Sequence, residues 1–87
     1  MKDVLMMVLG NCPHCRHARE IMEKLCEEHP AYRAVHFRIV DEAEHPDFAA
    51  TLDYHYVPTI FVDGQKMHEG VPTRQALEAI YLMALEK

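Results

Sequence analysis

The sequence predicts an α/β domain in which three helices cover a four-stranded mixed sheet. Three observations carry this prediction: an unbroken apolar stretch at residues 4–9, an amphipathic helical pattern directly after it, and a hairpin signal at Asp63-Gly64. The expected order of elements is strand, helix, strand, helix, strand, strand, helix (βαβαββα). We expect residues 1–87 to form a single domain, because a chain of 87 residues has room for one hydrophobic core.

The first half of the chain has the pattern of a βαβ unit. Val4 to Leu9 is apolar throughout, as in a strand that is buried on both faces, and Gly10-Asn11 ends it. From Pro13 to about His29, apolar residues recur at spacings of three and four, which predicts a helix that begins with proline. Val35 to Val40 alternates apolar and polar residues, as in a strand with one covered face. A connecting helix makes these two strands parallel, with a right-handed crossover.

The second half predicts a short helix, a hairpin and a final helix. The short helix is expected at Pro46 to Leu52, and its apolar stripe would be formed by Phe48, Ala49 and Leu52. Thr59–Val62 and Gln65–Glu69 flank Asp63-Gly64, a dipeptide that readily takes the positive φ angles of a two-residue hairpin turn. Thr73 can cap the last helix. The stripe of that helix comprises Ala76, Leu77, Ile80, Tyr81, Ala84 and Leu85.

Composition and charge exclude several classes of function. Hydrophobic residues make up 49% and charged residues 26% of the chain, which is the ordinary composition of a globular protein. We also expect the protein to be a monomer. The formal net charge is -5 and no run of lysine or arginine is present, which argues against nucleic acid as a partner. The apolar stretch at residues 4–9 is far shorter than the roughly 20 residues of a membrane span. No signal-peptide pattern is found, so we expect a cytoplasmic protein with no membrane partner.

Two of the three cysteines lie close together, in the sequence Cys12-Pro13-His14-Cys15. Three cysteines are too few for the disulfide framework of a small secreted protein, and a close pair in a reducing compartment is more often catalytic or metal-binding. Cys26 lies eleven residues beyond Cys15, which is about 16 Å along a helix. We therefore expect Cys26 to be a packing thiol.

The position of the close pair predicts its chemistry. Cys12 falls where the first strand stops and the helix starts, so free N–H groups and the helix dipole favour its thiolate and lower its pKa. Cys15 lies one helical turn further on and closer to the buried stripe. Cys12 would attack a disulfide and Cys15 would resolve the mixed disulfide. Pro13 stiffens the turn and His14 can stabilise the Cys12 thiolate, so both are expected to tune the pKa.

These features together resemble the thioredoxin superfamily, and the length is closest to that of glutaredoxins. The residues that carry the resemblance are the buried strand, the pair Cys12 and Cys15 at the next helix start, and Val57-Pro58-Thr59 leading into the hairpin. The resemblance implies a thioredoxin-like fold of glutaredoxin size, and a cis Val57-Pro58 bond that lies against the dithiol. It also implies that the Val57 backbone pairs with an extended substrate segment, so Val57, Pro58 and Thr59 are the expected substrate-binding residues.

The activity that the resemblance implies is thiol-disulfide exchange through Cys12 and Cys15. The substrate would be a disulfide-containing protein or a low-molecular-weight thiol, and the electron donor would be glutathione or a reductase. No cofactor is needed for this chemistry. Thioredoxins usually have a buried aspartate about six positions before the first cysteine, where this chain has Met6. His14, Asp41 or Glu42 would have to accept the proton instead.

Two other classes of function remain open from the residues alone. The same cysteines could hold a metal ion or an iron-sulfur cluster, although no second ligand pair with suitable spacing follows them. Alternatively, the chain could be a thioredoxin-fold interaction domain whose cysteines react too slowly to matter.

Overall fold

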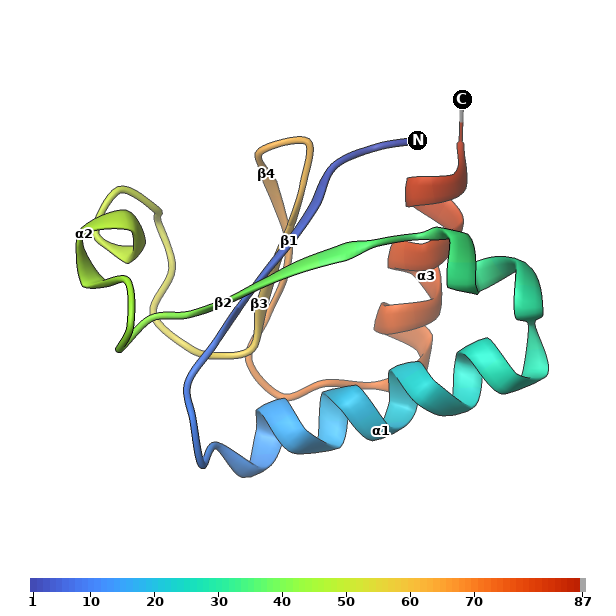
Figure 1. Ribbon diagram of the computed structural model, residues 1–87, viewed down its shortest axis with the longest axis horizontal. Coiled ribbons are helices and arrows are strands. Elements are labelled where there is room, and N and C mark those ends of the chain that lie inside the picture. The colour runs from blue at the N-terminus through green and yellow to red at the C-terminus, as the bar shows by residue number, and fades with distance from the viewer. Residues whose placement is uncertain (87) are drawn as a thin grey trace.

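The computed structural model describes residues 1–86 and has the predicted order of strands and helices. The elements are β1 (Val4–Val8), α1 (Pro13–Glu28), the 3₁₀ helix η1 (Pro30–Ala34), β2 (Phe37–Asp41), α2 (Pro46–Ala49), β3 (Thr59–Val62), β4 (Gln65–Glu69) and α3 (Arg74–Leu85). The strands form one sheet in the order β2-β1-β3-β4, in which β1 is parallel to β2 and antiparallel to β3. Helices α1 and α3 lie on one side of the sheet and α2 lies on the other (Figure 1). The predicted fold class is confirmed. No helix within residues 1–86 is long and apolar enough to cross a membrane.

The central strand β1 is buried on both faces, as its unbroken apolar sequence predicted. Val4, Met6 and Val8 belong to the main core cluster, which also contains the buried residues of α1 and α3. Leu5 and Met7 point to the other face and belong to a second, smaller cluster beneath α2. Because successive side chains of a strand alternate between faces, one short strand supports both cores.

The second strand differs from its prediction in both position and burial. It was expected at Val35 to Val40, but β2 runs from Phe37 to Asp41. Val35 instead closes η1, where its N–H donates to the carbonyl of Tyr32 at 3.0 Å. The expected covered face is incomplete as well, because Ile39 is 42% exposed. Ile39 lies at a sheet edge and lines an open cleft beside α1, so no helix packs over it.

The short helix α2 is also smaller than predicted, since it covers Pro46–Ala49 and stops before Leu52. After it the chain turns, and the Thr51 hydroxyl donates to the carbonyl of Phe48 at 2.6 Å. Such local side-chain bonds compete with continued helix. Ala49 and Leu52 pack against the second cluster as predicted, but Phe48 is 37% exposed. The predicted three-residue stripe is therefore wrong at Phe48.

The hairpin and the final helix follow their predictions. Asp63 and Gly64 have φ angles of 49° and 82°, both in the left-handed region that this turn requires. The hydroxyl of Thr73 accepts the N–H of Ala76 at 3.1 Å and so caps α3. The buried residues of α3 are Leu77, Ile80, Tyr81 and Ala84.

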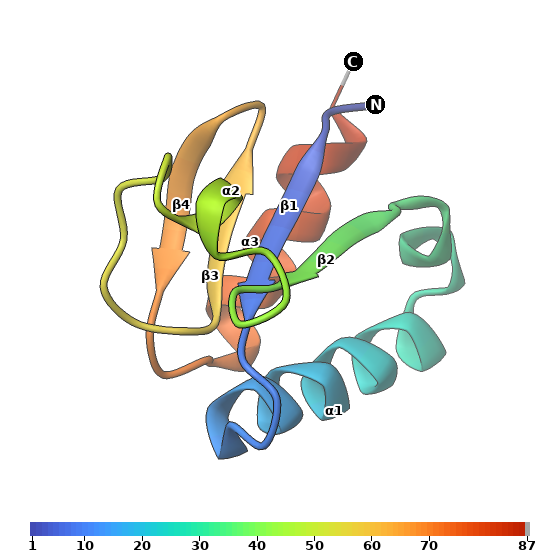
Figure 2. The same ribbon diagram turned by 60° about the vertical axis from the view of Figure 1, so that its left-hand side comes forward.

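The register of the strands brings several loops together at one end of the sheet, the end where β1, β2 and β4 stop and β3 starts. Val8 at the end of β1 lies opposite Asp41 at the end of β2, because these strands are parallel. Met7 lies opposite Thr59 at the start of β3, and Thr59 lies opposite Glu69 at the end of β4. The segments that follow β1 and β2, precede β3 and follow β4 therefore gather at the same edge, next to the start of α1 (Figure 2).

Candidate active site

Cys12 lies at the start of α1, in the position that the sequence predicted. Asn11 takes a φ of 65°, a left-handed conformation that asparagine tolerates better than most residues, and this turns the chain out of β1. Cys12 is the N-cap residue, with extended φ and ψ angles of -83° and 118°. Its carbonyl accepts the N–H of Arg16 at 3.1 Å. The Cys12 side chain is half-buried, and all three cysteines of the chain are free thiols.

The surroundings of Cys12 favour its thiolate. Desolvation of the half-buried sulfur works to raise the pKa of Cys12, but several donors outweigh it. The backbone N–H and the thiol of Cys15, the backbone N–H of His14 and the charge of Arg16 together lower this pKa below the ordinary value of a thiol. These groups belong to the first helical turn, where N–H groups have no partner within the helix. Cys12 is therefore suited to be a nucleophile.

Cys15 has the opposite environment one turn further along α1. Its side chain is 4% exposed and belongs to the main core cluster. Desolvation, together with the hydrogen bond to Cys12 and the proximity of its charge, raises the pKa of Cys15 to about 11, although the Leu9 backbone and Arg19 oppose this. The two thiols thus differ in both exposure and acidity, as required for an attacking and a resolving cysteine.

The two residues between the cysteines are both exposed. His14 acts on the pKa of Cys12 through its backbone N–H, a group that any residue except proline supplies. His14 also lines a groove beside the motif. Pro13 occupies the first helical position, as expected. The roles of the Pro13 and His14 side chains in tuning the pKa stay predictions.

A groove next to the motif is built around Val57, and we call it the Val57 groove. It has a volume of about 530 Å³. Its lining residues are Leu9, His14, Glu42, His55, Tyr56, Val57, Gly70 and Val71. The Val57-Pro58 peptide bond is cis, which is the geometry that the family resemblance implied. Val57 is half-buried and lines the groove, whereas Pro58 and Thr59 are buried and do not line it. Of the three expected substrate-binding residues, Val57 is the one that lines the groove.

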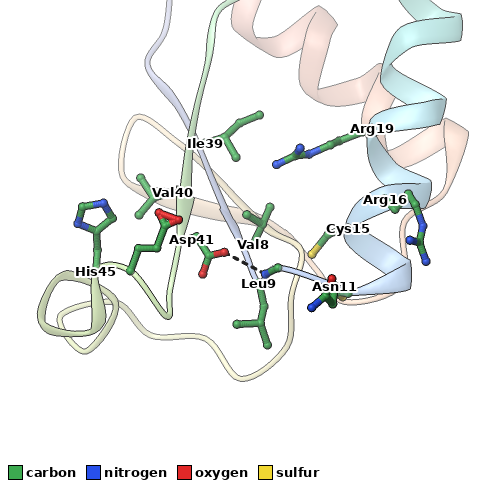
Figure 3. A pocket seen from close by; sticks show the side chains of 13 residues that line it. Val8, Leu9, Asn11, Cys15, Arg16, Arg19, Ile39, Val40, Asp41 and His45 are labelled. Carbon is green, nitrogen blue, oxygen red and sulfur yellow. Dashed lines mark hydrogen bonds between the residues drawn. The ribbon is translucent and has the colours of Figure 1, made fainter.

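A second hollow, the α1–β2 cleft, also borders the motif (Figure 3). It has a volume of about 470 Å³ and is lined by both Cys12 and Cys15. Figure 3 shows the Cys15 sulfur facing the cleft, opposite Asp41 and Ile39.

Of the carboxylates expected to replace the missing buried aspartate, Asp41 lines this cleft. Glu42 instead lines the Val57 groove and accepts a hydrogen bond from the Tyr54 hydroxyl at 2.7 Å. Asp41 as a proton acceptor stays a prediction.

Two carboxylates at this edge hold loops, a role that sequence reasoning missed. Asp41 accepts the N–H of Gly10 at 2.9 Å and so ties the loop after β1 to the end of β2. Glu69 accepts the N–H groups of His55 and Tyr56 and so ties the loop before β3 to the end of β4. No local sequence signal marks either contact, because both join segments that only the sheet register brings together.

Cys26 lies on α1 as a half-buried thiol that packs against the core. Its sulfur donates a hydrogen bond to the Tyr81 hydroxyl at 3.5 Å, which agrees with a packing role.

Within residues 1–86, no group of three or more histidine, cysteine, aspartate or glutamate side chains is arranged to hold a metal ion. The metal-binding alternative stays a prediction, and elemental analysis of anaerobically purified protein would test it.

A four-stranded mixed sheet with a Cys-X-X-Cys pair at a helix start, beside a proline loop, defines the thioredoxin class of thiol-disulfide oxidoreductases. Residues 2–82 match the thioredoxin domain family, so this chain belongs to that family. It is 37% identical over 70 residues to a thioredoxin of Methanocaldococcus jannaschii, an alignment that covers 79% of this chain and 80% of the relative. Family and fold together support a role in thiol-disulfide exchange.

Solved structures show the same fold. A chain from a study of the thiol resolving mechanism of a yeast mitochondrial 1-Cys peroxiredoxin via glutathione/thioredoxin systems is 26% identical, with a TM-score of 0.70. That alignment covers 94% of this chain and 77% of the other. A mutant thioredoxin from Halobacterium salinarum is 21% identical, with a TM-score of 0.69, over 99% of this chain and 76% of the other. These likenesses confirm the thioredoxin-like fold.

Proposed function

We propose that this protein exchanges disulfides with protein or low-molecular-weight substrates by cycling Cys12 and Cys15 between dithiol and disulfide. The observation that carries the proposal is the contrast between two thiols one helical turn apart at the same sheet edge. Cys12 is half-exposed with a lowered pKa, whereas Cys15 is buried with a raised pKa. The family to which the chain belongs supports the same chemistry.

In the first step, the Cys12 thiolate attacks one sulfur of the substrate disulfide. A new bond forms between Cys12 Sγ and that sulfur, the substrate S–S bond breaks, and the other substrate sulfur leaves as a thiolate that takes a proton from solvent. The lowered pKa of Cys12 serves this step, because the thiolate and not the thiol is the nucleophile.

In the second step, Cys15 gives its proton to solvent in the α1–β2 cleft, which it lines, and its thiolate attacks Cys12 Sγ. The mixed disulfide breaks, the second substrate sulfur leaves as a thiolate, and the two electrons that reduced the substrate have come from the dithiol. Once Cys12 is bound to substrate it carries no charge, so one of the influences that raise the pKa of Cys15 is removed. A thiol donor, such as glutathione or a reductase, returns the Cys12-Cys15 disulfide to the dithiol by the same steps in reverse.

The Val57 groove is suited to receive the segment that flanks a substrate disulfide. Several apolar side chains around it are exposed: Tyr56 is 70%, Val71 is 62% and Leu9 is 39% accessible. Exposed apolar side chains gathered at one place mark an interaction site more often than scattered ones do. We propose that an extended peptide lies in this groove and pairs with the backbone of Val57.

The thiol assignment predicts a specific pH profile for alkylation by iodoacetamide. At pH 8, a thiol with a pKa of about 11 is ionised in only about one molecule in a thousand, so Cys15 should react slowly. Cys12 should react with an inflection below the ordinary pKa of a thiol, since its thiolate persists as pH falls. Mass spectrometry of peptides assigns each modified cysteine. Equal rates at Cys12 and Cys15, or an inflection for Cys12 above the ordinary value, would contradict the assignment.

Cys15→Ser should trap the first intermediate. Without the resolving thiol, the bond between Cys12 and substrate has no internal attacker, so mixed disulfide should accumulate to nearly one substrate per chain. Non-reducing gel electrophoresis with a disulfide-bonded peptide measures this. The double variant Cys12→Ser, Cys15→Ser is the control and should trap none. Trapping by the double variant would place the attack at another cysteine and refute the proposed roles.

A further inference from the structure

The segment before β3 has no regular secondary structure, yet it supplies one wall of the Val57 groove. Residues 51–58 belong to neither helix nor strand. His55, Tyr56 and Val57 from this segment all line the groove. Because irregular backbone makes no ladder of hydrogen bonds, other groups must satisfy its N–H and carbonyl groups and hold its position.

Glu69, at the end of β4, holds this segment by two consecutive backbone groups. Its Oε2 accepts the N–H of His55 at 2.5 Å and the N–H of Tyr56 at 2.9 Å. The end of β4 lies beside the segment that leads into β3 (Figure 2). Glu69 does not line the groove itself. Glu69 therefore contacts the backbone of His55 and Tyr56, the residues that a substrate in the groove would touch, without facing the groove itself.

The carboxylate is itself held in place from the other side. Its Oε1 accepts a hydrogen bond from Lys66 Nζ at 2.8 Å, and its side chain is only 20% exposed. The Lys66 ammonium and the two N–H groups together lower the pKa of Glu69 to about 2, although desolvation opposes them. Glu69 is thus an anion throughout the neutral range, and its bonds to the loop are the charge-assisted kind, which are stronger than neutral ones.

Two further hydrogen bonds hold the backbone carbonyl groups of this segment. The hydroxyl of Thr59 donates to the carbonyl of Tyr56, and the N–H of Gly70 donates to the carbonyl of Pro58 at 3.0 Å. These contacts hold carbonyl groups, whereas Glu69 holds the N–H groups of His55 and Tyr56. Removing the carboxylate would leave the direction of the Tyr56 and Val57 side chains less well determined.

We propose that Glu69 is a positioning residue for disulfide exchange, because it fixes the backbone of His55 and Tyr56 and thereby the wall of the Val57 groove. The inference rests on the proposed function, in which that groove receives the substrate. Glu69 acts through the loop and touches neither the thiols nor the substrate. Its loss should therefore weaken substrate binding and leave the reactivity of Cys12 intact.

The test compares Glu69→Ala and Glu69→Gln with Lys66→Met, using reduction of a disulfide-bonded peptide. In Glu69→Ala, KM should rise about tenfold while kcat stays within about twofold, the pattern of lost positioning of the substrate. Glu69→Gln keeps an oxygen acceptor, so its KM should rise only about threefold. Lys66→Met removes the ion pair that holds the carboxylate from one side but leaves both N–H contacts, so its KM should rise by less than that of Glu69→Ala.

Two readouts separate positioning from general loss of structure. By NMR, the amide protons of His55 and Tyr56 should exchange faster in Glu69→Ala, while those of β1 stay protected. Alkylation of Cys12 by iodoacetamide, which needs no groove, should proceed at the wild-type rate. If Glu69→Ala does not fold, the same measurements on Glu69→Gln decide.

Each outcome bears on the inference. An unchanged KM in folded Glu69→Ala, unchanged exchange at His55 and Tyr56, or an equal loss in Cys12 alkylation would overturn it. A wild-type chain that reduces no disulfide would overturn the proposed function and the inference together. An active wild type with unaffected Glu69 variants would overturn the inference alone.

Discussion

Replacing Cys12 with serine is expected to reduce disulfide reductase activity by at least about 10³-fold, which is the scale of loss when an enzyme loses its nucleophile. Serine preserves the size of the side chain at the N-cap, but its hydroxyl does not form the thiolate on which exchange depends. The measurement is the rate at which the protein, with dithiothreitol as electron source, reduces the disulfides of insulin.

Cys26→Ser provides a matched control for this prediction, because Cys26 lies on the same helix. About 21 Å of α1 separates the two cysteines, and Cys26 faces the Tyr81 hydroxyl and the core, away from both hollows. Its substitution should leave the rate within about twofold of wild type. Comparable activity in wild type and Cys12→Ser would refute the mechanism. A large loss in Cys26→Ser would give that thiol a role in exchange.

Leu77→Ala is expected to lower the free energy of unfolding by about 2–5 kcal/mol, the range for a buried leucine cut back to alanine. Leu77 is 0% exposed and belongs to the core that α1, α3 and the sheet share. For a small domain, whose total stability is about 5–15 kcal/mol, this is a large fraction. Urea denaturation followed by circular dichroism measures the change.

Leu82→Ala on the same helix is the comparison for Leu77→Ala. Leu82 is 54% exposed, so its truncation removes little buried area, and alanine favours helix at least as well as leucine. We expect a change within about 0.5 kcal/mol of wild type. Equal losses at the two positions would mean that the face of α3 that packs on the sheet has been assigned wrongly.

Local patterns were enough to predict most of the elements. The unbroken apolar run at β1, the capping threonine of α3 and the Asp63-Gly64 turn each depend on residues within a few positions, and each prediction agrees with the structure. The placement of Cys12 at the N-cap belongs to the same group, since it follows from where one strand stops and one helix starts. The roles of Cys12 and Cys15 are proposals built on that placement.

Predictions failed where an element lies at an edge of the fold. Ile39 continues the apolar alternation of Phe37, yet it is exposed because no helix packs over that part of β2. Phe48 continues the stripe of Ala49 and Leu52, but α2 is too short to bury it. Periodicity shows which side chains share a face, and only the packing of neighbouring elements decides how far that face is covered.

The sequence by itself determined the α/β class, the position of Cys12 and Cys15, and the resemblance of the chain to the thioredoxin superfamily, because these depend on local spacing. Only the tertiary structure decided how the site is held together. The raised pKa of Cys15 comes first from its burial in the core, and the carboxylates of Asp41 and Glu69 reach their loops because the strand register places them there. Burial and register arise from contacts between residues far apart in the chain, which no local pattern records.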